Sequence, residues 1–331
     1  MLTCVTLSSL AKVFADEQPR NTPLKRFSML KNERSSFQTA LFSDREDDLT
    51  LTVKIDSDIA CAVNIFSVEA IPSGLPAYKD HDDYYLRTEP GLFPDLLRPV
   101  SGSFILSAKQ WQSVWFELDP AGEIKAGEYT VSINFCSAGV TLASTRMTVE
   151  IINANLPTQT LIHTNWFHTD CLASWYKAEV FDDEYWRITE NFVRNAVHHG
   201  INFILTPLFT PPLDTQIGGE RPTVQLVEVI LQNKQYSFDL KNLKRWVKMC
   251  NRCGVAYFEM SHLFTQWGAR YAPKVEVTVD GKRIKLFGWN TWAASKKYTE
   301  FLTEFAKALN AFMAENALKD RCFFHVSDEP S

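Results

Sequence analysis

The chain has 331 residues, of which 45% are hydrophobic and 22% charged, and its formal net charge is −5 at pH 7. This composition is typical of a globular protein, and the length favours two domains over one. The weak negative charge and the lack of Lys/Arg runs argue against nucleic acid or an anionic membrane as a partner.

The N-terminal segment has no basic region before its apolar residues, so it does not resemble a secretory signal. No apolar stretch approaches the roughly 18 residues of a membrane span. The seven cysteines are odd in number and scattered, which does not indicate a disulfide framework. These features together predict a cytoplasmic protein, and they give no indication of its oligomeric state.

Residues 1–157 are predicted to form an antiparallel β-sandwich domain. Short apolar or alternating runs recur there, separated by turn-forming residues, at the spacing that such a fold requires. The runs are residues 35–42, 49–55, 62–70, 112–118, 127–135 and 145–152. Residues 72–100 are rich in Pro, Asp and Tyr and are predicted to be a long ordered loop.

Residues 158–331 follow a short linker, and in them the pattern changes to alternating strands and helices. Predicted strands at 161–165, 201–205, 255–260 and 321–326 alternate with predicted helices at 182–199, 237–253 and 298–318. This alternation implies a parallel sheet with right-handed crossovers. No glycine-rich phosphate-binding pattern follows a strand, so no cofactor is expected.

We expect this domain to be the first half of a (β/α)8 TIM barrel rather than an open doubly wound sheet. Long aromatic loops follow the predicted strands, whereas short loops precede them, and barrel active sites lie on the former face. A whole barrel needs about 250 residues, so we expect a chain truncated at its C-terminus. A half barrel leaves an open sheet edge, which makes activity of this chain alone uncertain.

Two adjacent carboxylates, Asp328 and Glu329, follow the last predicted strand in the segment FFHVSDEPS. Pro330 ends the strand pairing, which puts both acids at the carboxyl end of the sheet. Neighbouring carboxylates repel each other, so one tends to keep its proton. A protonated acid beside an ionised one is what cleavage of a glycosidic bond requires. The alternative is that the two acids are only a solvated strand end.

Aromatic, histidine and acidic side chains at the other strand ends are candidates for binding a sugar. These are Trp166, His168, Asp214, His262, Phe264, Trp267, Trp289 and His325. The competing interpretation is that each Trp or His is a structural residue. A metal site built from His163, His168, His262 and Asp328 lacks the usual ligand spacing, so no metal is predicted.

A hairpin is predicted at residues 274–287, because Asp280 and Gly281 form a type I′ turn signal between alternating strands. It interrupts the loop after the third predicted strand. It is either a flap over the site or a surface feature.

Several segments resemble glycoside hydrolase family 123, the β-N-acetylgalactosaminidases. They are HTNWFHTDCLA (163–173), ILTPLFTPPLDT (204–215), SHLFTQWGARYAPK (261–274), HVSDEP (325–330) and, in the first domain, PGLFPDLL (90–97). The resemblance covers most of the chain, and the third and fourth of these segments are the most specific.

The resemblance implies an exo-acting, retaining hydrolase in which the acetamido oxygen of the substrate attacks its own anomeric carbon to form an oxazoline. Asp328 would then orient the acetamido group, and Glu329 would act as general acid and afterwards as general base. The implied substrates are β-linked GalNAc-containing glycans, including glycolipid oligosaccharides. Two alternatives stay open: a glycan-binding protein without turnover, and a hydrolase of the same fold that acts on another sugar.

Overall fold

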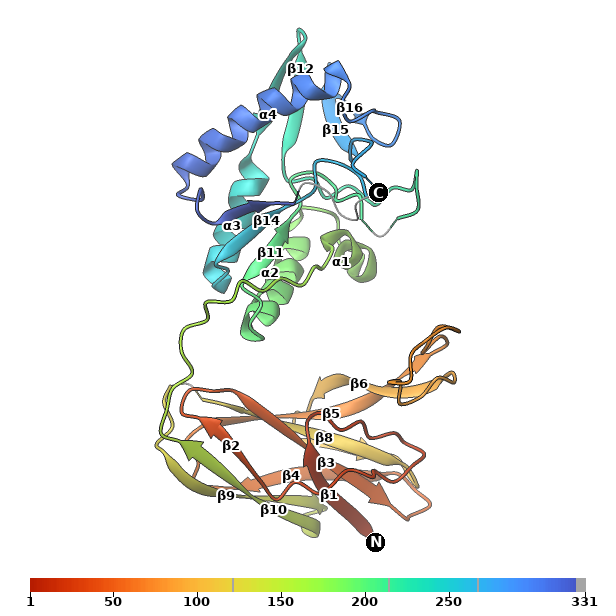
Figure 1. Cartoon of the computed structure of the whole chain (residues 1–331). Helices are drawn as coiled ribbons and strands as arrows, with labels where there is room; N and C mark the ends of the chain where they lie inside the picture. The colour runs from red at the N-terminus through yellow and green to blue at the C-terminus, as the bar shows by residue number, and fades with distance from the viewer. Residues whose placement is uncertain (121, 214, 267, 326–331) are drawn as a thin grey trace. The chain divides into compact units, whose positions relative to one another are not determined.

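The computed structural model describes residues 1–120, 122–213, 215–266 and 268–325 (Figure 1). The chain divides into two compact units, residues 1–158 and 159–331. This division falls one residue after the predicted domain boundary. No helix in the described ranges has both the length and the apolar character to cross a membrane.

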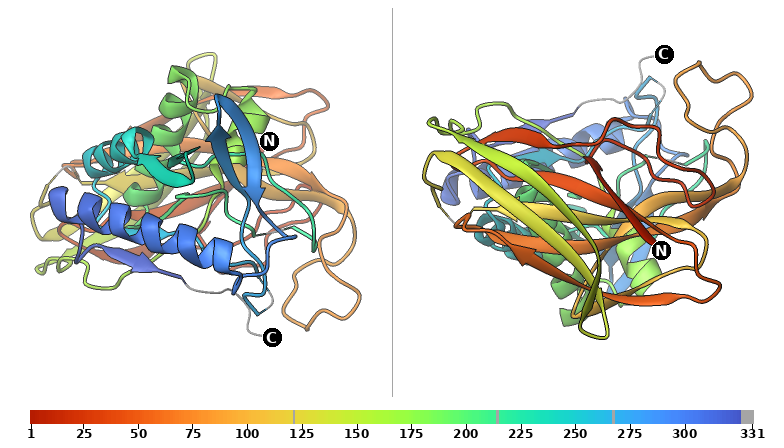
Figure 2. Two further views of the ribbon diagram at one scale, coloured as in Figure 1. Left: turned by 90° about the horizontal axis from the view of Figure 1, so that it is seen from above. Right: turned by 90° about the horizontal axis from the view of Figure 1, so that it is seen from below.

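The first unit consists of two five-stranded sheets. One sheet is antiparallel throughout and contains, in spatial order, β1 (Leu2–Ser8), β3 (Ser35–Ser43), β8 (Trp111–Asp119), β5 (Ala62–Ser73) and β6 (Gly91–Pro99). The other contains β2 (Arg26–Leu30), β10 (Val140–Ile152), β9 (Gly127–Ser137), β4 (Leu49–Asp56) and β7 (Ser103–Leu106). Only β2 and β10 run parallel. Figure 2 shows this unit from below.

Both sheets contribute to a single hydrophobic core, as in a β-sandwich. Phe37 and Phe116 of the first sheet stack with ring centroids 5.1 Å apart. They lie in the same buried cluster as Leu51 and Phe135 of the second sheet. The predicted alternation of apolar residues follows from this, because each strand turns every second side chain toward the core.

Strand β6 corrects part of the prediction of a long loop over residues 72–100, while residues 74–90 do form a loop between β5 and β6. Strand β6 pairs only with β5 and forms the edge of its sheet. Pro94 and Pro99 lie in this strand, and proline is tolerated at a sheet edge because no neighbour needs its missing N–H. The prolines therefore indicated a loop where the fold has an edge strand.

The second unit contains a three-stranded parallel sheet whose spatial order follows the chain order. Its strands are β11 (Phe203–Thr206), β14 (Tyr257–Met260) and β17 (Cys322–Phe324). The helices are α1 (Thr169–Tyr176), α2 (Asp183–His198), α3 (Lys241–Cys253) and α4 (Lys296–Glu315) (Figures 1 and 2). The sequence predicted all of these elements except α1, with small shifts at their ends.

The strand predicted at residues 161–165 is reduced to one parallel bridge, between Thr164 and Phe203. Leu161 is exposed. The side chain of Asn202 accepts a hydrogen bond from the backbone N–H of His163 at 2.8 Å. The Asn202 side chain thus replaces one of the backbone hydrogen bonds that a regular strand would form with its neighbour.

A second sheet of this unit was not predicted. It has four strands in the order β13 (Gln235–Asp239), β12 (Glu228–Gln232), β15 (Val275–Val279) and β16 (Lys282–Phe287). Residues 237–239, expected at the start of a helix, lie in β13 instead. The predicted hairpin is β15–β16, and Asp280 and Gly281 have the positive φ values of a type I′ turn, 49° and 76°.

The hairpin belongs to a sheet and is not a free flap. Strand β15 pairs in parallel with β12, and Val275, Val277 and Phe287 are fully buried in the core of the unit. Helices α3 and α4 add Trp246, Phe301 and Phe305 to that same core. Burial on this scale makes the hairpin part of the scaffold.

Candidate active site

A buried carboxylate, Glu259, lies near the carboxyl end of the central parallel strand β14. Its residue exposure is 5%. One carboxylate oxygen, Oε2, accepts hydrogen bonds from the indole N–H of Trp166 at 2.7 Å and from the hydroxyl of Thr164 at 3.2 Å. The other, Oε1, lies 3.1 Å from Nδ1 of His325. Glu259 therefore connects the first strand position with the residue that follows β17.

Nδ1 of His325 donates to Oε1 of Glu259 in the imidazole tautomer that carries its proton on Nδ1. A carboxylate that fixes the tautomer and orientation of an imidazole is a common arrangement in active sites.

Trp166, His262 and His325 form one aromatic group beside Glu259. The ring centroids of His262 and His325 are 4.2 Å apart, and Trp166 lies 5.5 Å and 5.7 Å from these two rings. His262 is fully buried, whereas Trp166 and His325 are partly exposed. The structure thus brings together three of the side chains that the sequence proposed for sugar binding.

Sequence reasoning missed Glu259, although a signal was present. The predicted third strand reads VAYFEM, and an acid in such an apolar run is unusual. Acidic residues are almost never fully buried unless they are paired. An acid within a buried strand therefore indicates partners at the end of that strand.

Two other predicted residues make their contacts elsewhere. Phe264 packs against the core of the unit, with its ring centroid 6.3 Å from that of Tyr298 of α4. Trp289 donates its indole N–H to the carbonyl of Gly219 at 2.9 Å and lies 6.2 Å from the ring of Tyr271. Both aromatic rings support loops in these contacts, and neither contact involves the group at Glu259.

His168 precedes helix α1 as its N-cap residue and has extended backbone angles. It lines a void of about 10 Å³ together with Asp170, Leu205 and Pro207. A void of this size holds about one water molecule and no sugar ring. The role of His168 in sugar binding stays a prediction.

An ion pair between Asp170 and Arg221 joins helix α1 to the loop that follows β11. Nε and Nη2 of Arg221 donate to the two carboxylate oxygens of Asp170 at 3.1 and 3.2 Å. The two side chains are only 5% and 10% exposed. Arg221 also donates to the carbonyl of Leu213 at 3.2 Å. This bidentate contact holds the loop after β11 against the start of α1.

Four predicted site residues lie outside the described residues: Asp214, Trp267, Asp328 and Glu329. The last described residue is His325, three positions before Asp328. The contact between His325 and Glu259 is therefore the described feature nearest in sequence to the two acids.

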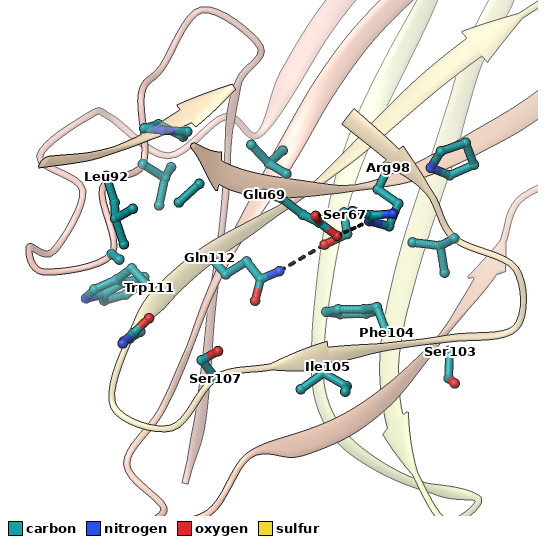
Figure 3. Close-up of a pocket in the computed structure, with 18 residues that line it drawn as sticks. Ser67, Glu69, Leu92, Arg98, Ser103, Phe104, Ile105, Ser107, Trp111 and Gln112 are labelled. Carbon is teal, nitrogen blue, oxygen red and sulfur yellow. Dashed lines mark hydrogen bonds and ion pairs between the residues drawn. The ribbon is translucent and has the colours of Figure 1, made fainter. Parts of the chain in front are cut away.

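A larger cavity lies in the first unit, between the two sheets (Figure 3). Its volume is about 400 Å³, and its polar lining includes Ser67, Glu69, Arg98 and Gln112. Among the described residues that line it, Glu69 is the only carboxylate, and it is paired with Arg98. The cavity therefore lacks the two acids that glycosidic cleavage needs.

Comparison with known proteins identifies a family for the part of the chain that contains the parallel sheet. The sequence model of the glycoside hydrolase 123 catalytic domain matches residues 166–331. A family 123 glycoside hydrolase from Clostridium perfringens, solved in work on glycolipid glycan hydrolysis, is similar in structure with a TM-score of 0.73 and 13% sequence identity. The match covers 98% of this chain and 58% of that one, so this chain spans well under two thirds of the clostridial structure.

Two further structures match about half of the chain with low scores. The N-terminal domain of PorA has a TM-score of 0.24 and 8% identity and covers 46% of this chain and 100% of that one. AvmM, which catalyses a macrocyclization in alchivemycin A biosynthesis, has a TM-score of 0.25 and 8% identity, with 48% and 92% covered. TM-scores this low support no conclusion about the fold or function of this chain.

No curated protein matches the sequence. The family match covers half of the chain and contains Glu259, the aromatic group beside it and the segment that leads to Asp328 and Glu329. On this match, the chain belongs to glycoside hydrolase family 123.

Proposed function

We propose that the protein is an exo-acting, retaining β-N-acetylgalactosaminidase that uses the acetamido group of its substrate as the nucleophile. The observation that carries this proposal is the contact of His325 with buried Glu259, which fixes the strand end leading to Asp328 and Glu329 beside Trp166. Family membership and the similarity to a clostridial family 123 glycoside hydrolase support the reaction class.

In the first proposed step, Glu329 donates its proton to the glycosidic oxygen while the bond between that oxygen and C1 breaks. The acetamido oxygen of the sugar forms a new bond to C1, which gives an oxazoline and releases the alcohol. Asp328 accepts a hydrogen bond from the acetamido N–H and stabilises the positive charge that develops there. No nucleophile from the protein is needed.

In the second step, Glu329 takes a proton from water as the oxygen of that water attacks C1. The bond between C1 and the acetamido oxygen breaks, and Glu329 regains its proton. Two inversions at C1 leave the configuration unchanged, so the enzyme is retaining. Adjacent acids suit this division of roles, because one addresses the 2-substituent and the other the leaving oxygen.

We further propose that the parallel sheet is the first part of a (β/α)8 barrel. Four strand positions lie side by side in chain order, namely the bridge at Thr164 and then β11, β14 and β17. A barrel has this order, whereas a doubly wound sheet reverses direction at a switch point. The cluster around Glu259 lies near the carboxyl ends of the strands, where barrel enzymes place their chemistry.

The assay that tests the function is release of p-nitrophenol from its β-N-acetylgalactosaminide. Glu329→Gln is expected to lower kcat/KM by about 10²- to 10⁴-fold, since it removes proton transfer. Asp328→Asn is expected to lower the rate strongly on this substrate, while Asp320→Asn, an exposed acid before β17, serves as the matched control.

Four outcomes would contradict the proposal. Unchanged rates in either variant would remove the role given to that acid. Equal rates on the β-galactoside, which lacks the acetamido group, would exclude substrate assistance. Binding of N-acetylgalactosamine in calorimetry, together with no release of p-nitrophenol, would favour a glycan-binding protein. Turnover of another hexosaminide, and not of the N-acetylgalactosaminide, would mean that the enzyme acts on a different sugar.

A further inference from the structure

Polar side chains occupy core-facing positions at one end of the β-sandwich. In strand β8, Val114, Phe116 and Leu118 are fully buried and face the second sheet. Residues two apart in a strand share a face, so Gln112 faces the same way. Its partner in β3 is Leu41, which also belongs to the core. A core-facing Gln breaks the apolar pattern that the rest of the strand follows.

The same break occurs in the two neighbouring strands. Ser67 of β5 is paired with Val114 on one side and with Arg98 of β6 on the other, so all three side chains lie on the same face of the sheet; Ser67 and Val114 are buried there, whereas the Arg98 side chain is 62% exposed at the sheet edge. Glu69 follows Ser67 by two positions and faces the same way. Polar residues at core-facing positions reduce stability, and natural proteins keep them chiefly where function requires them.

These polar groups are held by one another. Gln112 donates its amide N–H to the hydroxyl oxygen of Ser67 at 2.9 Å, and Ser67 is only 4% exposed. Arg98 donates from Nε and Nη2 to the two carboxylate oxygens of Glu69, with 2.8 Å between Nη2 and Oε2. Figure 3 shows these side chains around the cavity.

The cavity between the sheets has a volume of about 400 Å³. Small-molecule sites usually measure about 300–1,000 Å³, so this space suits one or two sugar rings. Phe104 of β7 and Leu92 of β6 add apolar surface to the wall. The site thus combines apolar walls with a few fixed polar groups, as ligand pockets do.

The charges in the cavity limit which chemical class of ligand can bind there. Arg98 lowers the pKa of the Glu69 carboxyl through its hydrogen bonds, so the pair stays ionised at neutral pH. A compensated pair gives an anion no free positive charge, and one carboxylate is too few for a divalent cation. An apolar ligand would cover both charges without forming hydrogen bonds to them.

A neutral sugar meets all of these conditions. Each hydroxyl group both donates and accepts, so adjacent hydroxyls can bond to a carboxylate and a guanidinium at once. The amide of Gln112 offers a further donor and acceptor. We propose that the cavity lined by Ser67, Glu69, Arg98 and Gln112 is a binding site for a neutral saccharide unit, separate from the site of hydrolysis.

Calorimetry on the full chain tests this proposal, with methyl β-galactoside and N-acetylgalactosamine as neutral probes and N-acetylneuraminate as an anionic one. Concentrations up to about 50 mM cover weak sites. The variants are Arg98→Met and Gln112→Leu, which keep volume but remove hydrogen bonds. Arg26→Met is the matched control, because Arg26 is a comparably exposed arginine paired with Glu150 on the second sheet.

We expect a neutral probe to bind, and both cavity variants to weaken that binding by about tenfold or more. Arg26→Met should leave it unchanged, and soaked crystals should show the sugar between the sheets. No binding of either neutral probe, or equal weakening in the control, would overturn the proposal. Tighter binding of N-acetylneuraminate than of the neutral probes would contradict the proposal that the ligand is a neutral saccharide. Hydrolysis of the nitrophenyl substrate by the unaltered chain tests the proposed reaction separately, so failure of this binding test leaves that reaction intact.

Discussion

At the scale of single residues, Glu259 is a buried carboxylate that contacts three other side chains. A buried carboxylate is costly unless several donors compensate the loss of water. Three donors do so here, from Thr164, Trp166 and His325. An amide in place of this carboxylate could keep the bonds from Trp166 and Thr164 only if His325 changed to the tautomer without a proton on Nδ1. Glu259 thus fixes Trp166 and His325 by the same bonds that make its own burial possible.

Glu259→Gln is expected to lower the free energy of unfolding by about 1–3 kcal/mol, since its amide N–H would either oppose the donors of Trp166 and Thr164 or force His325 into its other tautomer. Urea unfolding followed by tryptophan fluorescence measures this. Glu184→Gln is the control, because Glu184 is an exposed acid paired with Arg187 on α2, and its loss should change stability by about 0.5 kcal/mol or less. Equal effects of the two substitutions would refute the structural importance of Glu259.

At the scale of elements, Glu276 joins the second sheet of this unit to the loop that precedes it. The hydroxyl of Thr223 donates to Oε1 at 2.6 Å, while Nε of Arg283 lies 2.6 Å from Oε2 and Nζ of Lys274 lies 3.4 Å from Oε1. Partial burial raises the pKa of Glu276, but the hydroxyl and the two cations outweigh it and lower the pKa overall. The carboxylate therefore belongs to the folded structure in its ionised form.

This gives a pH-dependent prediction. The folded pKa of Glu276 lies below the unfolded value of about 4.3. Its stabilising contribution is therefore complete above that value and is lost as the pH falls through the folded pKa. Glu276→Gln should cost about 1 kcal/mol or less at pH 7, since the site is partly solvated.

The difference between Glu276→Gln and the unaltered chain should shrink below about pH 4. Chemical unfolding at several pH values checks this. Glu300→Gln, on the exposed face of α4, is the control and should show no such trend. A stability difference that grows toward acid pH would contradict the assignment.

At the scale of the whole molecule, each unit has a core of its own. The buried clusters of the sandwich contain only residues before 152, and the large cluster of the second unit contains only residues after 172. A unit that buries its own apolar surface can fold alone. The side chain of Asn32 and the backbone of Leu156 exchange hydrogen bonds of 2.6 and 3.0 Å, which secures the end of the first unit.

Residues 1–158, expressed alone, are expected to fold into a β-rich domain with one cooperative thermal transition. Circular dichroism and differential scanning calorimetry check this. A fragment ending at residue 125 is the matched control. It lacks β9 and β10, which lie in the middle of their sheet, and should not fold. Loss of cooperativity in both fragments would show that the sandwich depends on the second unit.

Local sequence patterns determined the elements whose signals depend on near neighbours. The apolar stripes of α2, α3 and α4 repeat within a helical turn, and Asp280-Gly281 defines a turn through backbone angles that few other residues adopt. The alternating runs of β3, β4, β8 and β9 likewise needed no distant partner to be recognised. These patterns, with the segments that resemble family 123, were enough for the family and for the two-sheet first unit, while the barrel stays a prediction.

Only the tertiary structure decided which distant residues meet. The pairing of β6 with β5 made an edge strand of a proline-rich segment, and the pairing of β12 with β15 made the hairpin part of a sheet. Glu259 acquires its role from Trp166 and His325, which lie 93 and 66 positions away. Long-range register depends on how whole faces pack, and no local pattern encodes it. The sequence thus predicts chemistry at Asp328 and Glu329, while packing revealed the buried carboxylate that contacts His325 at the end of the strand before them.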